Sequence, residues 1–480
     1  MTRFDMDFLA RIARRLSRSK AVFACLTAIL IFGGFSCGQD EDVTDLTQPF
    51  TIKYWRVFDD RDAFRDIVTA YQTLHPHIKI DYRLFRYDEY ERELLNAISE
   101  DRGPDIFSIH NTWMNEWRPR LLAAPATLSI PYTEMKGSLK KEAVTTIKSV
   151  PGVTVRQVAN DFIDAVSYDV VIPTEQADPR APLIPRVYGL PLSVDTMVMY
   201  YNRDILNAGG IAKPASHWLE FQEHVKKITR LDEAGNIIQP AASLGTAENV
   251  ERASDILSVL MMQNGAEMTD DDGVATFDRI PEELTGRTTP PGAEALIFYT
   301  DFANPEKEVY TWNAKMPDSL EAFVKGQTAY FFGYSYHLAQ IRQQNAALNF
   351  GIAPLPQIEG NKPVNYGNYW VEVVSDKTEH PDEVWEFLQF MTAAEQAQKY
   401  LGVTKKPTAL RSLINSQLED IDLSVFASEL PTAMTWYRGS DADATESTFK
   451  EMIEQMLAGE EPDPVRIVGL GATKVNQTIE

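Results

Sequence analysis

Residues 51–109 read TIKYWRVFDDRDAFRDIVTAYQTLHPHIKIDYRLFRYDEYERELLNAISEDRGPDIFSI. Three segments of this stretch have the alternating or continuously apolar character of strands, and they lie near residues 51–58, 78–84 and 105–109. Between them, apolar residues recur every three to four positions, which is typical of helices. The order of strand, helix, strand, helix and strand predicts a parallel α/β sheet, because neighbouring parallel strands need a crossover between them.

A similar order of elements returns in the second half of the chain. Residues 187–201 have strand character, Ser216 precedes an amphipathic helical pattern, and residues 329–333 predict another short strand. The chain has 480 residues, whereas a single hydrophobic core stops growing at roughly 250–300 residues. We therefore expect two α/β lobes.

A long amphipathic helix is predicted later in the chain. Pro381 stands at its first position, and its apolar residues share one face as far as Leu401. Gly402 stands where helices commonly end with a glycine. The pattern predicts one continuous helix over residues 381–401.

The amino terminus has the pattern of an export signal. Basic residues precede an unbroken apolar run from Ala21 to Ser36, and Cys37 follows at once. The run is shorter than the roughly 20 residues that span a bilayer as a helix, which favours a cleaved signal. Gly34-Phe35-Ser36-Cys37 resembles the lipobox of bacterial lipoproteins, although Gly34 replaces the usual leucine. Three outcomes stay open: lipidation of Cys37, an uncleaved anchor helix, or a free secreted protein.

The charge of the chain changes sharply at Cys37. Six of the 46 basic residues and two of the 69 acidic residues precede it, so the body that follows carries a net charge near −27. Such a body repels nucleic acid and anionic lipid headgroups, which excludes both as partners. Residues 38–48 (GQDEDVTDLTQ) have the composition of a solvated tether, and folding is expected to begin near Phe50.

No catalytic or metal-binding pattern stands in a context that supports it. The letters G-x-S-x-G occur at residues 34–38, but at the end of the signal rather than between a strand and a helix. The histidine pairs lack zincin spacing, and residues 469–474 lack the glycines of a nucleotide-binding loop. We therefore predict no catalytic residue, no metal site and no cofactor.

Aromatic residues stand beside polar ones at several expected strand ends and loops. The clearest examples are Tyr54-Trp55-Arg56, Asn111-Thr112-Trp113, Asn368-Tyr369-Trp370 and Trp436-Tyr437-Arg438. A sugar ring has apolar C–H faces that stack on aromatic rings, and hydroxyl groups that need polar partners. The pattern favours a ligand cleft, although core packing explains any single one of these aromatic residues equally well.

Several segments together resemble the extracellular solute-binding proteins of ABC importers, in the maltose-binding-like family 1. They are residues 103–106 (GPDI), 188–206 (YGLPLSVDTMVMYYNRDIL), 214–228, 322–329 (AFVKGQTA) and 351–356 (GIAPLP). The strand around Trp370, the helix from Pro381 and residues 401–411 resemble late elements of that family's first lobe. The resemblance extends over residues 51–459.

The resemblance implies an α/β, two-lobed periplasmic-binding-protein-like fold. Each lobe would be a mostly parallel sheet flanked by helices, with the ligand cleft between the lobes. The chain would cross between the lobes near residues 193–196, near Pro356 and near Arg411. The expected division is residues 1–36 as signal or anchor, 37–50 as acidic tether, 51–194 and 357–411 as lobe 1, and 195–356 and 412–480 as lobe 2.

The resemblance also assigns ligand-binding positions, residue by residue. Trp55 and Asp59 match the end of the family's first strand, and Asp195 matches its hinge position. Tyr334 and Tyr336 stand where the family often has a tryptophan pair, so the stacking surface would be narrower here. The full expected set is Trp55, Asp59, Trp113, Asp195, Tyr334, Tyr336, Trp370, Trp436 and Tyr437.

The function implied by the resemblance is solute capture without catalysis. A monomer at the outer face of the cytoplasmic membrane, or in the periplasm, would close its lobes around a small polar solute such as a sugar. It would then deliver the solute to the permease subunits of an ABC importer. Two alternatives remain: a tethered adhesion or sensor module on the same fold, and an exported glycoside hydrolase with two carboxylates about 5 or 6.5–9.5 Å apart.

Overall fold

The computed structural model describes residues 47–137, 140–176, 178 and 180–479. These described residues divide into two compact units, a smaller one with residues 47–49, 131–137 and 140–147, and a larger one that contains the rest. The expected signal or anchor segment, Cys37 and most of the tether lie outside the described residues. Within the described part of the chain, no helix is both long and apolar enough to cross a membrane.

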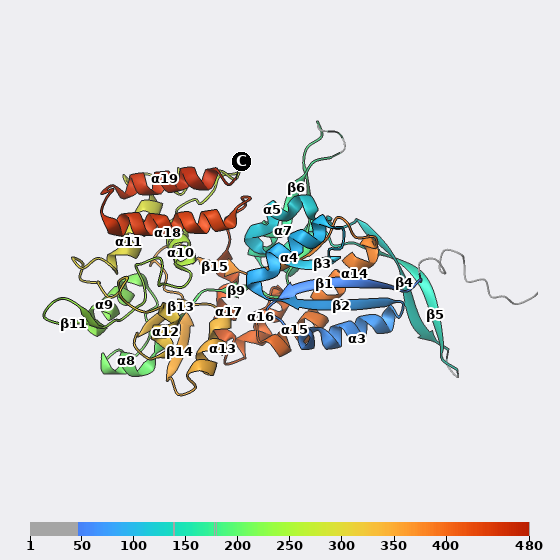
Figure 1. The fold of residues 1–480 in the computed structure, drawn as a ribbon, viewed down its shortest axis with the longest axis horizontal. Coiled ribbons are helices and arrows are strands. Elements are labelled where there is room, and N and C mark those ends of the chain that lie inside the picture. Colours follow the sequence, from blue (N-terminus) through green and yellow to red (C-terminus); the bar gives the residue numbers. More distant parts are fainter. Residues whose placement is uncertain (1–46, 138–139, 177, 179, 480) are drawn as a thin grey trace, which may run out of the picture. The chain divides into compact units, whose positions relative to one another are not determined.

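The first sheet of the larger unit contains the elements that residues 51–109 predict (Figure 1). Its strands are, in spatial order, β2 (Ile78–Phe85), β1 (Phe50–Val57), β3 (Ile106–His110), β16 (Trp370–Val374) and β8 (Gly189–Leu190). Strand β1 pairs in parallel with β2 and β3, and the connecting helices are α3 (Arg65–Leu74) and α4 (Tyr87–Ser99). The parallel β-α-β-α-β prediction is confirmed, and β16 adds antiparallel pairing with β3 and β8.

Two helices occupy the segment for which the sequence predicts one. Helix α14 (Pro381–Thr392) ends at Ala393, whose ψ of 146° is extended, and α15 (Ala394–Thr404) begins at once. Gly402 lies inside α15, and the helix ends at Lys405, whose φ of 54° is left-handed. The prediction of one helix ending at Gly402 is therefore wrong. Both helices bury residues in the same core, so the apolar periodicity continues across the break and does not reveal it.

The second lobe contains a three-stranded sheet with the order β13-β10-β14. Strand β10 (Val198–Asn202) is antiparallel to both β13 (Tyr330–Gly333) and β14 (Phe350–Pro354). The expectation of a mostly parallel sheet is therefore wrong for this sheet. The crossover unit β13-α13-β14 is present, with α13 spanning Ser335–Gln344, but β10, which follows the first crossing, lies between its two strands.

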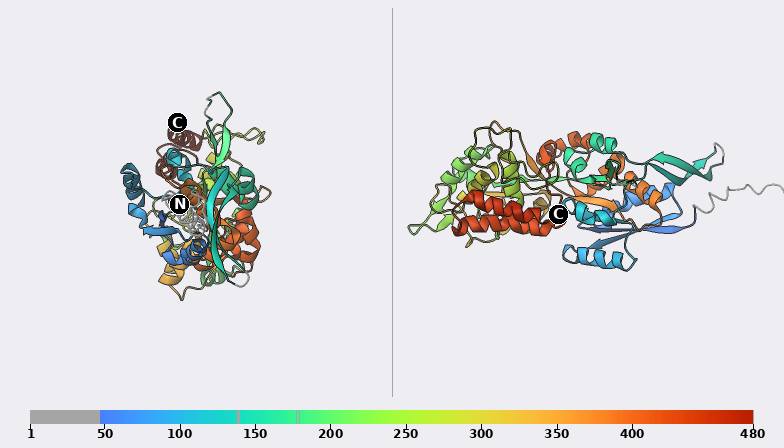
Figure 2. Two further views of the ribbon diagram at one scale, coloured as in Figure 1. Left: turned by 90° about the vertical axis from the view of Figure 1, so that its right-hand side faces the viewer. Right: turned by 90° about the horizontal axis from the view of Figure 1, so that it is seen from above.

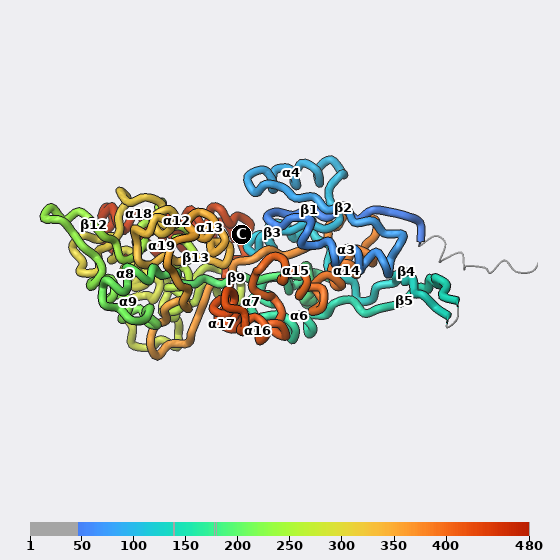
Figure 3. Tube along the Cα trace, turned by 90° about the horizontal axis from the view of Figure 1, so that it is seen from below, coloured from blue at the N-terminus to red at the C-terminus, as the bar shows by residue number. Residues whose placement is uncertain are grey.

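Two large hydrophobic cores distinguish the lobes, with a smaller third cluster around β10, and the chain passes between the two large cores three times (Figure 3). The cores change over between Val194 and Met197, between Tyr366 and Tyr369, and between Ala433 and Trp436. A short strand lies at each change, and the three pair in the order β17 (Ala433–Met434), β15 (Asn365–Asn368) and β9 (Asp195–Thr196). We call these three strands the hinge sheet. The lobe boundaries expected at 194/195, 356/357 and 411/412 remain a proposal.

The other elements surround these sheets. Around the first core lie α5 (Met114–Trp117), α6 (Val155–Asp161), α7 (Asp164–Val170), α16 (Arg411–Leu418), α17 (Ser424–Glu429), and the 3-10 helices η1 (Arg61–Phe64), η2 (Asn111–Trp113), η3 (Arg118–Arg120) and η4 (Leu430–Thr432). Around the second lie α8 (Arg203–Ala208), α9 (Trp218–Ile228), α10 (Ala253–Gln263), α11 (Pro291–Asp301), α12 (Ser319–Val324), α18 (Ala442–Ala458) and α19 (Pro464–Asn476). Helices α18 and α19 lie side by side (Figure 2).

Three pairs of strands stand apart from the larger sheets. They are β4 (Thr127–Lys136) with β5 (Glu142–Pro151), β6 (Val171–Thr174) with β7 (Ile184–Val187), and β11 (Arg230–Leu231) with β12 (Ile237–Gln239). Within the smaller unit, the Oγ1 atoms of Thr133 and Thr145 lie 2.8 Å apart and join β4 to β5.

Candidate functional site

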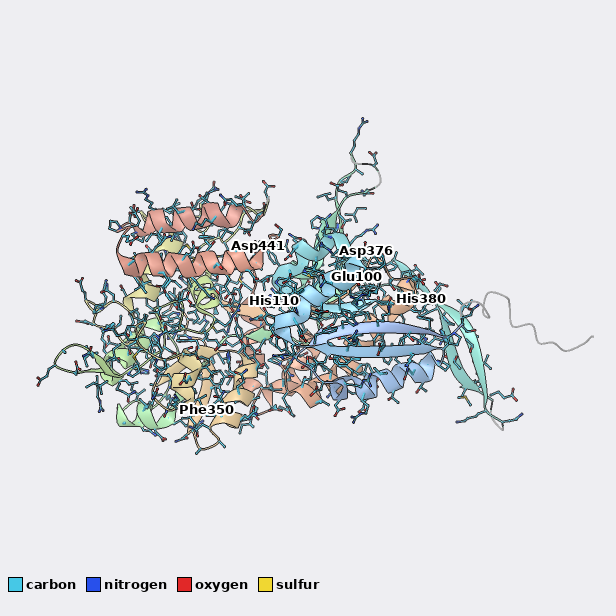
Figure 4. The ribbon with its side chains drawn as sticks, viewed as in Figure 1. Glu100, His110, Phe350, Asp376, His380 and Asp441 are labelled. Carbon is cyan, nitrogen blue, oxygen red and sulfur yellow. The ribbon has the colours of Figure 1, made fainter. Side chains whose placement is uncertain are left out.

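An aromatic cluster lies at the ends of β1, β3 and β16 in the first lobe. It consists of Phe58, Tyr87, His110, Trp113 and Trp370. The centroid of the Trp370 ring lies 5.7, 6.2, 5.8 and 5.6 Å from those of Phe58, Tyr87, His110 and Trp113, respectively. The carboxyl ends of the parallel strands β1 and β3 meet at this edge, where open α/β sheets bind ligands, and Figure 4 shows His110 there. The aromatic cluster is therefore a candidate wall of a ligand site.

Phe58 is the most unusual member of the aromatic cluster. Its side chain is 60% exposed, and that of Tyr87, which stacks on it at 5.8 Å, is 56% exposed. The backbone of Phe58 is left-handed, with φ at 73°, a conformation that costs a non-glycine residue roughly 1–2 kcal/mol. Strain of this kind persists mainly where a site needs it. The exposed ring and the strained backbone together make Phe58 a candidate for ligand contact.

His110 supplies a neutral polar group within the aromatic cluster. Its Nε2 lies 3.0 Å from Oδ1 of Asn368, and its Nδ1 lies 2.7 Å from Oγ1 of Thr112. Burial lowers the pKa of His110 to about 4, so the imidazole is uncharged at neutral pH. Both ring nitrogens are thus engaged by oxygen atoms of the protein, without adding charge to the aromatic cluster.

The second lobe presents a charged group around Arg252, just before α10. The guanidinium donates to both carboxylate oxygens of Asp255 at 2.8 Å and lies 3.4 Å from Glu446. The hydroxyl of Tyr334 donates to the same Asp255 at 2.6 Å. Arg252 is left-handed, with φ at 57°. A strained arginine locked by a bidentate carboxylate keeps its remaining N–H groups in a fixed orientation.

Charged residues of the second lobe shift the pKa values of residues beside the aromatic cluster. The pKa of Tyr87 is raised first by burial and then by the charge of Asp443, while the charge of Arg252 lowers it. The pKa of Glu116 is raised to about 7 by burial and by the charges of Glu91 and Asp441, and Asp441 is labelled in Figure 4. Groups of the first lobe thus lie within the field of the second.

The two acidic residues expected in the site are both engaged by the protein. Asp59 is 7% exposed, pairs with Arg56 at 2.9 Å and Lys406 at 2.7 Å, and accepts from the hydroxyl of Tyr400 at 2.9 Å. Burial opposes ionisation of Asp59, but the charges of Arg56 and Lys406 are stronger and lower its pKa. Asp59 therefore fixes the chain next to Phe58.

Asp195 joins the hinge sheet to the second lobe. Its carboxylate accepts from the backbone N–H of Ser335 at 2.9 Å and from its Oγ at 2.6 Å. Burial raises the pKa of Asp195 to about 6, although the Ser335 donors oppose the shift. A residue of the first crossing strand thus holds the start of α13.

The remaining expected residues differ in exposure. Trp55, Trp436, Tyr437 and Tyr334 are at most 4% exposed, whereas Tyr336 is 40% exposed and stacks on Tyr334 at 5.9 Å. Trp436 packs against Phe277 and Phe449. Among the described residues, the indole N–H groups of Trp55 and Trp436 have no hydrogen-bond partner. Trp113 and Trp370 are the expected residues that come together in the aromatic cluster.

A pocket of about 240 Å³ lies beside the aromatic cluster, where the loop after β3 meets the segment after β17. Its polar lining comes from Asn111, Thr112, Asn115, Arg118, Asp169 and Arg438, and its apolar lining includes Met114, Ile172, Pro173, Leu183 and Tyr437. We call it the Arg438 pocket. It places polar groups beside the stacking surface of the first lobe.

Sequence reasoning did not include Phe58, Tyr87, His110 or Arg252. Phe58 stands between the expected Trp55 and Asp59, but its exposure depends on a backbone angle that the sequence does not reveal. Tyr87 opens α4 and belongs to the same edge of the sheet as Trp113. The signal for His110 was its position at the end of β3, immediately before the expected Asn-Thr-Trp loop.

The chain resembles known proteins in sequence and in fold. Residues 58–398 match the sequence model of bacterial extracellular solute-binding proteins. A binding protein of Brucella abortus is 20% identical over 379 residues, covering 77% of this chain and 78% of that protein. The multiple sugar-binding protein of Streptococcus mutans is 25% identical over 283 residues, covering 57% of this chain and 64% of that protein.

Solved structures share the fold at low sequence identity. The cyclic α-maltosyl-1,6-maltose binding protein of Arthrobacter globiformis aligns with a TM-score of 0.68 and 19% identity, covering 90% of this chain and 99% of that one. The sugar-binding protein of Xanthomonas citri aligns with a TM-score of 0.66 and 16% identity, covering 89% and 97%. The two-lobed fold expected from the sequence is confirmed.

Proposed function

Because this chain belongs to the family of bacterial extracellular solute-binding proteins, we propose that it captures a sugar or oligosaccharide and delivers it to an ABC importer. The observation that carries the proposal is the aromatic cluster, with Phe58 and Tyr87 exposed at the end of the first sheet. An exposed aromatic pair held by a strained backbone suits the C–H face of a sugar ring. The names of relatives and structural neighbours, which include sugar-binding proteins, agree with this ligand class.

The binding residues are proposed from both walls. Phe58, Tyr87 and Trp370 would stack on the ligand, and the Arg252 group would hydrogen-bond its hydroxyl groups. The nine positions that the sequence assigns remain part of the proposal in two roles. Trp113, Trp370 and Tyr336 would contact the ligand, whereas Trp55, Asp59, Asp195, Tyr334, Trp436 and Tyr437 would support the walls from behind.

Transport would use closure of the two lobes about the hinge sheet. A ligand that contacts both walls binds the closed form more tightly than the open form, and this difference in affinity drives the closure. The closed protein would then dock on the permease subunits and release its cargo. The protein would act as a monomer and catalyse no reaction.

The proposal places the protein outside the cytoplasm. The family is extracellular, and the basic and apolar amino-terminal segment fits export. Tethering would use a lipid on Cys37, or an uncleaved amino-terminal helix. Mass spectrometry of the mature amino terminus would distinguish the two, since lipidation removes residues 1–36 and adds acyl mass.

A ligand screen tests the proposed function. Residues 50–480 would be heated with mono- and oligosaccharides, polyols, amino acids and polyamines, because a ligand that binds only the folded state raises the Tm. A sugar that raises the Tm and is recovered unchanged after long incubation would support the proposal. A hit confined to amino acids or polyamines, or any hydrolysis product, would contradict it.

A matched pair of variants connects the screen to the site. Tyr87→Ala should weaken binding of the sugar found in the screen about 10-fold, because one stacked ring is lost. Ile421→Ala removes an apolar side chain that is 92% exposed, and it should leave the affinity unchanged. Equal affinities of the two variants would remove Tyr87 from the site.

A further inference from the structure

The Arg438 pocket has an unusual balance of charge. The whole chain carries a net charge of −23, and several arginine side chains elsewhere pair with carboxylates, namely those of Arg56, Arg252, Arg287, Arg342 and Arg411. Arg118 and Arg438 both line the Arg438 pocket and are half-buried. In the part of the chain that the structure describes, no ion pair joins either guanidinium to a carboxylate.

Arg438 is held in place for contact with a ligand. Its guanidinium lies 3.5 Å from the centre of the Tyr168 ring, so the ring supports one face of the planar group. The hydroxyl of Tyr168 donates to the carbonyl oxygen of Trp436 at 3.2 Å, and Nδ2 of Asn115 donates to the carbonyl oxygen of Arg438. These contacts leave the N–H fork of Arg438 without a carboxylate partner among the described residues.

The one acidic residue of the pocket is engaged by the protein on both oxygens. Asp169 is 3% exposed and accepts from Nδ2 of Asn111 at 3.1 Å, from the hydroxyl of Tyr369, and from Oγ1 of Thr435 at 2.8 Å. Burial raises the pKa of Asp169 to about 6, so it is ionised at neutral pH. One negative charge thus faces two guanidinium groups, and the pocket keeps an excess positive charge.

A further polar atom in the pocket has no partner. Asn111 is 3% exposed, and while its Nδ2 donates to Asp169, its Oδ1 is buried with no hydrogen bond among the described residues. A buried acceptor without a donor costs about 1–3 kcal/mol. A ligand hydroxyl would remove that cost. The pocket therefore offers two cationic donors and one acceptor next to the aromatic cluster.

We propose that the Arg438 pocket binds the carboxylate of an acidic sugar, so that the solute captured is a uronate or an oligosaccharide that contains one. The inference rests on the proposed function, because the sugar ring would stack on the aromatic cluster. The planar forks of Arg118 and Arg438 match a carboxylate in geometry, and charge-assisted hydrogen bonds of this kind are strong. A volume of about 240 Å³ suffices for one ring or one substituent, since drug-sized ligands need roughly 300–1,000 Å³.

Calorimetric titration of the folded protein at pH 7.5 tests the inference. The probes are D-galacturonate and digalacturonate, their neutral counterparts D-galactose and galactobiose, and inorganic phosphate. An acidic sugar should bind at least 10-fold more tightly than its neutral counterpart, and this preference should weaken as the salt concentration rises.

Three substitutions assign the preference to the pocket. Arg438→Gln should reduce uronate affinity about 10- to 100-fold, which is the range for a hydrogen bond to a charged group, and Arg438→Lys should reduce it less. Arg120→Gln is the matched control, because Arg120 lies two residues after Arg118 and packs on Trp117 outside the pocket. The Tm of each variant checks that it is folded.

The outcomes separate this inference from the proposed function. If neutral sugars bind as tightly as uronates, or if Arg438→Gln and Arg120→Gln bind uronate alike, the inference is overturned while the proposed function stands. Binding of phosphate with no gain from a uronate would likewise overturn it. If none of these sugars binds while another, neutral sugar of the ligand screen does, the inference is overturned; if no sugar of either set binds, the proposed function itself fails.

Discussion

At the scale of single residues, the backbone conformation of Phe58 lowers the stability of the fold, while its exposed ring is proposed to bind the ligand. Its left-handed backbone costs a side chain roughly 1–2 kcal/mol, a cost that glycine does not bear. Phe58→Gly should therefore be about 1 kcal/mol more stable towards urea than Phe58→Ala, although both lose the stacking ring. Both variants should bind the sugar more weakly than the wild type. Equal stability of the two variants would contradict the strained conformation.

The hinge carboxylate makes a prediction about pH. Burial raises the pKa of Asp195 to about 6, from an ordinary value of 3.8. Between about pH 4 and 6 the folded chain keeps a proton that the unfolded chain has lost, so this group's contribution to the free energy of unfolding falls as the pH rises. Asn cannot lose that proton. The stability of Asp195→Asn relative to the wild type should thus rise from pH 4 to pH 7, by on the order of 1–3 kcal/mol.

Urea unfolding at several pH values measures this difference. Ser335→Ala is the control, because it removes one donor to Asp195 and keeps the titrating group. A difference between Asp195→Asn and the wild type that does not change with pH would show that Asp195 has an ordinary pKa.

Single residues of the site were predicted only in part from the sequence. Trp113 and Trp370 follow expected strand ends, and the structure brings them together. Trp55 and Asp59 stand on either side of Phe58, but an alternating pattern cannot indicate which of several neighbours is exposed. That choice depends on a positive φ and on the ion pair of Asp59 with Lys406, which lies 347 positions away in the sequence.

At the scale of elements, the sequence predicted helices and strands correctly where apolar residues recur at regular intervals. The β1-α3-β2-α4-β3 succession follows from the spacing of apolar residues and from Pro76 and Gly103 as breaks. The boundary between α14 and α15 was not predicted. Both helices bury apolar residues in the same core, and no glycine or proline separates them. Strand character was predicted for most of β10, but its antiparallel pairing with β13 and β14 was not, because these neighbours in space are far away in sequence.

The position of Gly402 inside α15 makes a prediction that distinguishes the observed helix from the expected one. An added Cβ would meet nothing within 4 Å, and alanine is favoured over glycine in a helix interior by about 0.8–1 kcal/mol. Gly402→Ala should raise the free energy of unfolding by about that amount in urea. Gly459→Ala is the contrast, because Gly459 ends α18 with φ at 68° and should lose about 1 kcal/mol. A loss of stability in Gly402→Ala would support the single-helix expectation.

At the scale of the whole molecule, the two large cores are joined by strands of only two to four residues. The shortness of these strands explains why the sequence did not predict how they pair. Length and composition predicted two lobes, and the first crossing was expected near residues 193–196, where β9 lies. Strands as short as β9 and β17 carry no periodic pattern of their own. Their pairing is decided by contacts between distant parts of the chain, which a single sequence does not display.

Asn365 holds these crossing strands together and should govern whether the lobes unfold as one. It is fully buried, its Oδ1 accepts from the backbone N–H of Met197 at 3.1 Å, and its Nδ2 donates to the carbonyl oxygen of Met197 at 2.8 Å and to Glu429 at 2.6 Å. Asn365→Ala leaves these groups without partners, at a cost of about 2–4 kcal/mol. Because the loss falls on the connection rather than on either core, tryptophan fluorescence and far-UV circular dichroism should then report two separate urea transitions.

Asn361→Ala is the matched control for this experiment, because Nδ2 of Asn361 donates to the carbonyl oxygen of Gln263 within the second lobe. It should keep one transition, at a slightly lower urea concentration than the wild type. Coincident transitions in Asn365→Ala would mean that the lobes are coupled by their packed surfaces rather than by the hinge sheet. In that case closure around a ligand would need the packed surfaces to slide, whereas a coupling confined to the hinge sheet lets each lobe move as a rigid body.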